Sequence, residues 1–404
     1  MTTTVNNEHK NIKVPNLRFK EFEGEWKEER LADIADLYKG TGISKDQLSD
    51  DGEPCILYGE LYTKYKSETI REVISKTNIN NTKLVRSKAN DVIIPCSGET
   101  AEDIATARCV LNGNILLGGD LNIIRLHGYD GAFMSYQLNG RRKYDIAKVA
   151  QGVSVVHLYG EHLKGVKTIN PCLEEQKKIA KLLSLLDERI ATQNKIIEDL
   201  KKLKSAIIEE HYRQTEKNEV CVADLGNHFN VGNLAKDDLS ETGKPCIIYG
   251  ELFTTYGEII SQIESHTNKT GGMILSKKGD LLFPSSTTVD AVSLIAPSVI
   301  NVDNVILGGD MFGIHISHNY NAQYLSYYFN HIAKKQLAKF AKGSTIIHLH
   351  YTDIEKAKLL LPSLEEQNRM AKCLVALDKK VSVEQNLLSS LTCQKSYLLQ
   401  QMFI

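Results

Sequence analysis

The chain has 404 residues, a charged fraction of 25 % and a formal net charge of −1, values that fit a soluble protein of two or more domains. No apolar run approaches the roughly 18 residues that a membrane span needs. The eight cysteines include no Cys-x-x-Cys pair, and the N-terminus shows no secretory signal. These features argue against a disulfide framework or a four-cysteine zinc site and favour a cytoplasmic protein with reduced thiols. A near-neutral total charge leaves a nucleic-acid partner open, because such a partner needs only a basic face.

Residues 1–30 form an N-terminal lead-in. We expect the polar stretch 1–11 to be disordered and residues 15–26, which contain the only tryptophan, to be ordered. We interpret Trp26 as a packing anchor rather than a ligand contact.

Residues 31–170 predict a first globular domain. Short apolar stretches at 55–58, 91–94 and 115–117 are bounded by Gly, Pro or Asp, as strands followed by turns are. A helix over 132–150 and a strand over 153–158 complete the domain. We therefore predict a mixed domain in which β-structure dominates.

Residues 171–214 predict a long amphipathic helix that begins with a proline and two glutamates. Its apolar residues recur at spacings of three, four and seven, which is typical of a coiled-coil stripe. The stripe consists of Ile179, Leu183, Leu186, Ile190, Ile197, Leu200 and Ile207. Gln193 lies on this stripe, where a polar residue can fix the register of pairing.

Residues 362–404 predict a second, matching helix. Each stripe position returns 191 residues later, as Met370, Leu374, Leu377, Val381, Leu388, Leu391 and Leu398. Glu384 matches Gln193, and Ser363 and Glu366 have the spacing of a capping box. We interpret both stripes as packing surfaces of spacer helices.

A second domain over residues 215–361 repeats the first. Tyr58-Gly59-Glu60-Leu61 returns as Tyr249-Gly250-Glu251-Leu252, Leu117-Gly118-Gly119-Asp120 as Leu307-Gly308-Gly309-Asp310, and residues 152–158 as residues 343–349. The offset is 191 for the first and third of these blocks and 190 for the second, which follows slips of a few residues after position 77. Such slips are expected for loops in duplicated domains.

The predicted fold is therefore α+β, with two duplicated, mixed, β-rich domains separated and followed by long helices. If the helices form an antiparallel coiled coil, a pseudo-two-fold axis relates the domains. A helix of about 35 residues at roughly 1.5 Å each is a spacer of about 50 Å. Because B-DNA repeats about every 34 Å, two domains so separated could read two short half-sites.

The set of motifs resembles the specificity subunit of Type I restriction-modification systems over nearly the whole chain. The resemblance rests on the duplicated Tyr-Gly-Glu-Leu blocks, the segments that end at Leu158 and Leu349, the repeated Pro-x-Leu-Glu-Glu-Gln helix starts, and the terminal residues 398–403. Each motif alone is weak. Their occurrence twice, in the same order, is specific.

The resemblance implies a DNA-binding subunit of a host-defence complex that performs no chemistry and binds no cofactor. One target-recognition domain would read each half of a gapped double-stranded site, and the helices would bind two methyltransferase subunits. These partners would bring S-adenosylmethionine for adenine-N6 methylation. Restriction subunits would add ATP- and Mg-dependent cleavage.

Two recurrent basic clusters on predicted helices are candidates for phosphate contact, because lysine and arginine beside tyrosine and asparagine suit a DNA backbone. They contain Arg141, Arg142, Lys143 and Lys148 in the first domain and Lys334, Lys335, Lys339 and Lys342 in the second. A solvated helix face is the alternative. Lys39 and Lys45, beside the loop Gly40-Thr41-Gly42, are further candidates.

Two polar loops directly after predicted strands are candidates for base reading, because their side chains can reach base edges. They contribute Ser97, Glu99 and Thr100 in the first domain and Ser285, Ser286, Thr287 and Thr288 in the second. Glutamate can accept from cytosine N4. An ordinary turn is the alternative, but divergence between the copies favours these loops as the place where the half-sites differ.

Other repeated residues favour structural roles. Tyr58, Glu60, Tyr249 and Glu251 are the same in both copies, which favours a structural turn. We interpret His157 and His348 as core or DNA-backbone histidines, and we predict no metal site. The Gly-Gly-Asp segments predict tight turns between strands.

Two other classes of protein remain as alternatives. One is a coiled-coil adaptor whose duplicated domains bind proteins or other ligands. The other is a stand-alone DNA-modifying enzyme, although the sequence has no Asn-Pro-Pro-Tyr/Phe motif and no glycine-rich S-adenosylmethionine loop after a strand.

Overall fold

The computed structural model describes residues 13–79, 83–152 and 155–404, so the expectation for residues 1–11 lies outside it. The chain forms two compact units, residues 1–195 with 386–404 and residues 196–385. Each unit contains one β-rich domain and part of each long helix. These helices are α7 (Leu173–Gln214) and α13 (Leu364–Gln401).

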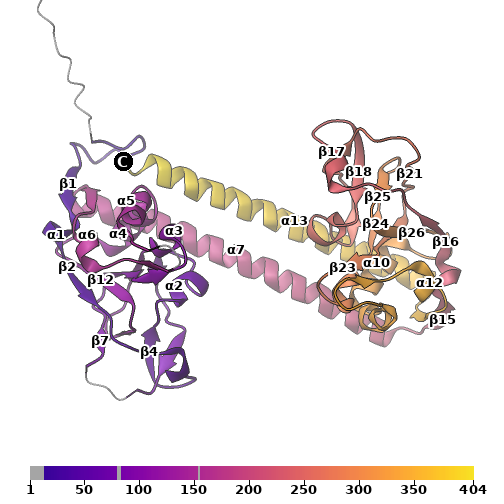
Figure 1. The fold of residues 1–404 in the computed structure, drawn as a ribbon, viewed down its shortest axis with the longest axis horizontal. Helices are drawn as coiled ribbons and strands as arrows, with labels where there is room; N and C mark the ends of the chain where they lie inside the picture. Colours follow the sequence, from indigo (N-terminus) through magenta and orange to yellow (C-terminus); the bar gives the residue numbers. More distant parts are fainter. Residues whose placement is uncertain (1–12, 80–82, 153–154) are drawn as a thin grey trace, which may run out of the picture. The chain divides into compact units, whose positions relative to one another are not determined.

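Within its described residues, the first domain contains two five-stranded sheets and two ribbons of two strands; Figure 1 shows where β1, β2, β4, β7 and β12 lie. The central sheet has the order β2 (Ala35–Lys39), β12 (Leu121–Leu126), β8 (Asp91–Pro95), β10 (Arg108–Val110), β5 (Thr69–Ile70). The outer sheet has the order β3 (Leu48–Ser49), β6 (Ser75–Thr77), β4 (Glu53–Ile56), β11 (Leu116–Leu117), β7 (Val85–Arg86). The ribbons pair β1 (Lys27–Arg30) with β14 (Lys167–Asn170), and β9 (Ser97–Gly98) with β13 (Val156–His157).

The helices of this domain are short. They are α1 (Leu31–Ile34), η1 (Lys45–Gln47), α2 (Glu60–Thr63), α3 (Ala101–Ile104), α4 (Gly131–Asn139), α5 (Lys143–Val149) and α6 (Gly160–Lys164). The predicted strands therefore appear as β4, β8 and β11, and β-structure dominates as expected. Of the strand predicted over 153–158, residues 156–157 form β13, and residues 153–154 lie outside the described part.

The strand β8 separates two apolar cores. Every residue of β8 is buried, and because side chains alternate along a strand, Val92 and Ile94 face one core while Ile93 faces the other. The first of these cores includes Ile179 and Leu183 of α7. The central sheet is therefore packed on both faces, which explains why its middle strand is a continuous apolar run.

The second domain repeats this topology strand for strand. Its central sheet is β16 (Gly226–Asn230), β26 (Met311–Ile316), β22 (Asp280–Pro284), β24 (Ser298–Ile300), β19 (Ile259–Ile260). Its outer sheet is β17 (Leu239–Ser240), β20 (Ser265–Thr267), β18 (Lys244–Ile248), β25 (Ile306–Gly308), β21 (Ile274–Leu275). Its ribbons pair β15 (Asn218–Cys221) with β28 (Lys358–Leu361), and β23 (Ser286–Thr287) with β27 (Ile347–His348).

Its helical segments match those of the first domain closely. They are η2 (Val222–Leu225), η3 (Lys236–Asp238), α8 (Glu251–Thr254), α9 (Ala291–Leu294), α10 (Ala322–His331), α11 (Lys334–Leu337), η4 (Ala338–Phe340) and α12 (Tyr351–Ile354). The predicted α+β class and the internal duplication are confirmed.

The prediction of one helix over 132–150 was wrong. The structure has two helices, α4 and α5, because the chain leaves helical geometry at Gly140, whose φ is −94° and ψ −106°. The second domain breaks at the matching place, between α10 and α11. The basic residues predicted on one helix face therefore lie after the break: on a turn and α5 in the first domain, and on α11, on η4 and just after η4 in the second.

The glutamine of each Pro-x-Leu-Glu-Glu-Gln motif joins a long helix to its domain. Gln176 and Gln367 are each 1 % exposed. The Gln176 amide donates to the Pro171 carbonyl at 2.8 Å, and its oxygen accepts from the Asp130 N–H at 2.9 Å, at the start of α4. Gln367 repeats both contacts, to the Pro362 carbonyl and from the Asn321 N–H, each at 2.9 Å. Since buried polar groups need partners, the motif fixes where each helix leaves its domain.

The two long helices run antiparallel within each unit. In the second unit, Lys204 of α7 contacts Asp378 of α13 at 2.9 Å, and His211 contacts Glu366 at 3.1 Å. In the first unit, Asp187 of α7 contacts Lys395 of α13 at 2.6 Å. Later residues of one helix therefore meet earlier residues of the other.

An ionic cluster, largely buried in the first unit and half-buried in the second, joins both helices to the domain in each unit. In the first unit, Lys395 also contacts Glu68 at 2.7 Å, and the Tyr136 hydroxyl donates to Asp187 at 2.7 Å. The Lys395, Glu68 and Asp187 side chains are 15 %, 12 % and 8 % exposed. Burial opposes the charge of Lys395, but Glu68 and Asp187 outweigh it and raise the lysine pKa.

The second unit contains the same cluster with the helices exchanged. Lys204 contacts Glu258 at 3.0 Å as well as Asp378, and the Tyr327 hydroxyl donates to Asp378. His331 also contacts Glu258, at 2.9 Å. The lysine comes from α7 here and from α13 in the first unit, so each domain is tied to both helices.

All predicted stripe residues are buried or half-buried. In the first unit these are Ile179, Leu183, Leu186, Ile190, Leu388, Leu391 and Leu398; in the second they are Ile197, Leu200, Ile207, Met370, Leu374, Leu377 and Val381. Gln193 and Glu384 are also buried. The Ser363 hydroxyl accepts from the Glu366 N–H at 3.3 Å, as the predicted capping box requires.

The N-terminal lead-in packs within the first unit against the end of the chain. Trp26 is 2 % exposed and meets Phe133 edge to face at 5.9 Å, while Phe403 stacks on Phe133 at 5.1 Å. The Leu17 N–H donates to the Gln401 carbonyl at 2.9 Å. The C-terminus lies beside α5 (Figure 1), where Arg142 donates to the Ile404 carbonyl. Trp26 is a packing anchor, as predicted.

Candidate functional site

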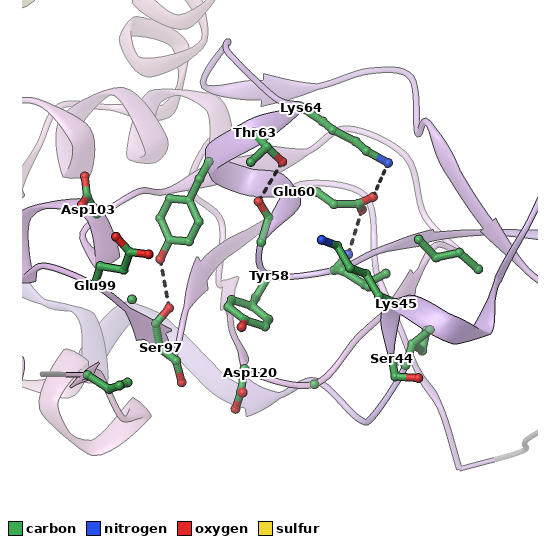
Figure 2. A pocket seen from close by; sticks show the side chains of 18 residues that line it. Ser44, Lys45, Tyr58, Glu60, Thr63, Lys64, Ser97, Glu99, Asp103 and Asp120 are labelled. Atoms are coloured by element: carbon green, nitrogen blue, oxygen red, sulfur yellow. Dashed lines mark hydrogen bonds and ion pairs between the residues drawn. The ribbon is translucent and has the colours of Figure 1, made fainter. Parts of the chain in front are cut away.

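A hollow of about 950 Å³ opens on the surface of the first domain (Figure 2). Five separate segments line it, including η1, α2 and the loop that follows β8. Its polar and charged side chains are Ser44, Lys45, Tyr58, Glu60, Tyr62, Thr63, Lys64, Ser97, Glu99, Asp103 and Asp120. The hollow therefore combines an aromatic wall with several carboxylates.

Buried glutamates hold the repeated Tyr-Gly-Glu-Leu turns. Glu60 is 6 % exposed, accepts from the Leu57 N–H at 2.9 Å, and contacts Lys64 at 2.8 Å. Glu251 is 9 % exposed and accepts from the Ile248 N–H at 2.9 Å. The structural interpretation of both glutamates is confirmed.

The tyrosines of these turns remain accessible. Tyr58 is 39 % exposed and lines the hollow, and Tyr249 is 36 % exposed. Tyr62, four residues after Tyr58, donates to the Ser97 carbonyl at 3.1 Å and so connects α2 to the loop after β8. Burial raises the Tyr62 pKa, so the hydroxyl stays protonated and can donate.

Backbone contacts hold the loop after each central strand on two sides. The Cys96 N–H donates to the Asp120 carbonyl at 2.7 Å, and the Leu158 N–H donates to the Cys96 carbonyl at 2.9 Å. In the second domain, Ser285 contacts Asp310 and Leu349 in the same way. The Gly-Gly-Asp segments are turns between strands, as predicted. Their aspartate carbonyls accept the hydrogen bonds from the loops.

The loop Gly40-Thr41-Gly42 packs against the same turn. A Cβ on Gly40 would lie 2.0 Å from the Gly118 carbonyl oxygen, so only glycine fits there. Lys39 ends β2 and Lys45 lies in η1 at the rim of the hollow, and both are exposed.

Each loop leads into a short helix with a side-chain N-cap, which is a threonine in the first domain and an aspartate in the second. Thr100 accepts from the Asp103 N–H at 3.0 Å, while Asp290 accepts from the Ser293 N–H at 2.7 Å. The Ser293 N–H and hydroxyl lower the Asp290 pKa. The two short helices therefore begin in the same way, although the second loop is one residue longer. Glu99 alone separates β9 from the N-cap in the first domain, whereas Thr288 and Val289 separate β23 from the N-cap in the second.

The candidate loop residues differ in accessibility. Glu99 and Thr100 are exposed and Ser97 is half-buried, and Ser97 and Glu99 line the hollow. Ser285 and Ser286 are only 4 % and 6 % exposed. In the second domain, the accessible predicted residues are therefore Thr287, which is half-buried, and Thr288.

The basic candidates fall into two groups. Arg141 donates to the Gln400 carbonyl at 2.6 Å, Arg142 contacts Asp145 at 3.2 Å in addition to Ile404, and Lys342 contacts Asp353. The exposed lysines away from these contacts are Lys148, Lys335 and Lys339, and Lys143 and Lys334 are half-buried.

Sequence reasoning did not select several residues of the hollow. Tyr62, Asp103, Asp120 and Val155 come from four segments, and only the tertiary structure brings them together. Tyr62 lies in the block that repeats best, which could have identified it. His157, by contrast, is explained locally, because its Nδ1 lies 3.4 Å from the Ser97 hydroxyl.

These observations define a class of protein. Two copies of one domain present loops of different side-chain chemistry at the same place in the fold, and each domain is fixed to the same pair of long helices. This arrangement is typical of a non-identical pair of binding modules on one helical support.

The family follows from comparison with known proteins. A family model described as the Type I restriction modification DNA specificity domain matches residues 23–202 and again residues 215–392. The chain belongs to this family and carries its domain twice.

Curated relatives agree with this assignment. The Type I restriction enzyme MjaVIII specificity subunit of Methanocaldococcus jannaschii is 24 % identical over 398 residues, which cover 91 % of this chain and 90 % of the relative. A putative Type I restriction enzyme MjaX specificity subunit of the same organism is 28 % identical over 240 residues, 55 % of each chain.

Solved structures share the fold. The S subunit of a Type I restriction-modification system from M. genitalium has a TM-score of 0.66 at 18 % identity, covering 97 % of this chain and 99 % of that one. A chain from a structure on complex assembly and conformational transition of the type I R-M system has a TM-score of 0.53 at 15 % identity, covering 94 % and 97 %. Within the described residues of this chain, no helix has the length and apolar character of a membrane span.

Proposed function

We propose that this chain is the DNA-reading subunit of a Type I restriction-modification complex and recognises a gapped site in double-stranded DNA. Each domain reads one half-site. The observation that carries the proposal is the double family match, together with two loops that follow equivalent strands, start equivalent helices and differ in length and side chains. A protein that reads two different half-sites needs two domains of the same fold whose DNA-contacting side chains differ.

The charge distribution supports the assignment of roles within each domain. Exposed lysines lie at the end of β2, in η1 and on the helical segments beside the loops, and they suit phosphates, which position a protein without reading sequence. The loops themselves offer carboxylate, hydroxyl and aliphatic groups, which suit base edges. Lys39, Lys45, Lys148, Lys335 and Lys339 are therefore proposed phosphate contacts.

The chemistry belongs to partner subunits in this proposal, and the chain itself is non-catalytic and binds no cofactor. Two methyltransferase subunits dock on the helices and bring S-adenosylmethionine for adenine-N6 methylation. Restriction subunits use ATP and Mg for cleavage. Membership of the specificity family supports this division of labour.

Co-expression with a Type I methyltransferase subunit from the same source tests the proposal. Adenine methylation is mapped across the host genome by long-read sequencing. The expected result is a split motif with one methylated adenine on each strand. A stable complex that methylates no motif would contradict the proposed function.

Inserting four residues after Lys201 is expected to lengthen the recognised spacer by one or two base pairs and leave both half-sites unchanged. Four residues add about 6 Å to a helix, against about 3.4 Å per base pair. The measurement is the methylation map of the variant. Replacing Lys201 alone is the control, and altered half-site bases with an unchanged gap would exclude the helix as the ruler.

A further inference from the structure

The loops that follow the two central strands differ at two matched positions. The residue before the helix N-cap is Glu99 in the first domain and Val289 in the second. The second residue of the helix is Glu102 in the first and Val292 in the second. Because both helices are capped in the same way, these residues occupy equivalent places relative to the start of the helix, although the second loop is one residue longer. Two carboxylates in one domain thus correspond to two aliphatic side chains in the other.

The valines of the second domain are unusually accessible. Val289 is 73 % exposed and Val292 39 % exposed, and Ile346, directly before β27, is 50 % exposed. The helix α9 lies against both β23 and β27. Val289, Val292 and Ile346 therefore belong to neighbouring segments. Exposed aliphatic groups gain free energy when an apolar surface covers them. If nothing bound to this surface, serine or threonine at these positions would be as suitable as valine.

In the first domain the equivalent groups carry charge. Glu99 and Glu102 are exposed, and Glu99 lines the hollow near Ser97 (Figure 2). A carboxylate can only accept hydrogen bonds at neutral pH. It therefore repels phosphate and attracts an amino group.

Basic helices stand beside both loops. The helix α3 lies against α5, and α9 lies against α11. The charge of Lys334 reaches the loop, since it contributes to the lowered pKa of Asp290. Phosphates held by these lysines would bring base edges to the loop, where Val289 and Glu99 stand.

We infer that Val289 and Val292 are specificity-determining residues that contact the C5 methyl of a thymine in one half-site. At the matched positions, Glu99 and Glu102 accept from the amino group of a cytosine or adenine in the other half-site. Thymine is distinguished in the major groove by this methyl, and cytosine and adenine by their N4 and N6 amino groups. The inference rests on the proposed function and adds the chemistry of each half-site.

Replacing single thymines by deoxyuridine tests the contact, because deoxyuridine lacks only the methyl group. The complex of the full chain with its methyltransferase subunit is titrated with duplexes that carry one deoxyuridine at each thymine of the mapped motif. The wild-type complex is expected to bind one or two of these duplexes about fourfold more weakly, the loss expected for one buried methyl. All sensitive thymines should lie in the same half-site.

Variants connect the sensitive thymine to the valines. Val289→Ala with Val292→Ala should bind the thymine and deoxyuridine duplexes equally, while Val14→Ala, at an exposed valine of the N-terminal lead-in, should discriminate as the wild type does. Glu99→Gln with Glu102→Gln should relax one position of the other half-site only. A motif without a thymine-sensitive position, or sensitivity that survives the valine variant, overturns the inference. Absence of any motif with the wild type contradicts the proposed function instead.

Discussion

Lys395→Met is expected to lower the free energy of unfolding of the first unit by about 3–5 kcal/mol, because it leaves two buried carboxylates without their cation. Lys395 contacts Glu68 at 2.7 Å and Asp187 at 2.6 Å, and the Tyr136 hydroxyl already donates to Asp187. Methionine retains most of the volume of lysine and removes the charge. The loss therefore measures the unpaired carboxylates rather than a cavity.

Trp26 provides the measurement, since it is the only tryptophan and is buried in the first unit. Its fluorescence during urea unfolding should show an earlier midpoint for Lys395→Met. The exposed Lys181 of α7, replaced in the same way, is the control. Adding Glu68→Gln and Asp187→Asn should recover much of the loss. A change below about 1 kcal/mol would mean that water, and not Lys395, satisfies the carboxylates.

Glu258→Gln is expected to destabilise the second unit at pH 7 by about 3 kcal/mol and to have little effect near pH 2. Burial alone would raise the Glu258 pKa, but His331 and Lys204 outweigh it and lower this pKa from 4.5 to about 2. A depressed pKa stabilises the folded state above the unfolded-state value, and the contribution is lost as the pH falls from about 4.5 towards 2. The predicted difference follows from about 1.4 kcal/mol for each pH unit of that interval.

Urea unfolding by circular dichroism at several pH values tests this prediction, with Trp26 fluorescence reporting the first unit separately. The difference between wild type and Glu258→Gln should shrink steadily as the pH falls below 4.5. Glu241→Gln, at an exposed carboxylate of the same unit, should show no such trend. A difference that does not depend on pH would contradict the ionic role of Glu258.

The local patterns of the chain predicted most of its elements. Stripes of spacing three, four and seven predicted α7 and α13, and apolar runs between turn residues predicted β4, β8 and β11. Such patterns are local because a helix or strand repeats over a few residues. The break at Gly140 was missed, since Leu138 and Ile146 on either side of it still have the spacing of one helix face and a single glycine is tolerated in a helical pattern.

The candidate site was predictable only in part. The loops with Glu99 and Thr288 were selected because the copies diverge there, but Val289 was passed over, since a lone valine is usually a core residue. Its exposure of 73 % is known only from the structure. Ser285, selected for its polarity, is buried beneath the loop.

By itself, the sequence determined the duplication, the two domains with their long helices, and the resemblance to a specificity subunit, because repeats and periodicities are properties of neighbouring residues. Only the tertiary structure decided which distant groups meet. Lys395 and Glu68 are 327 positions apart, and five separate segments form one hollow. Such contacts arise when the burial of apolar faces brings remote parts of the chain together, and no local pattern records which polar groups are then left to pair.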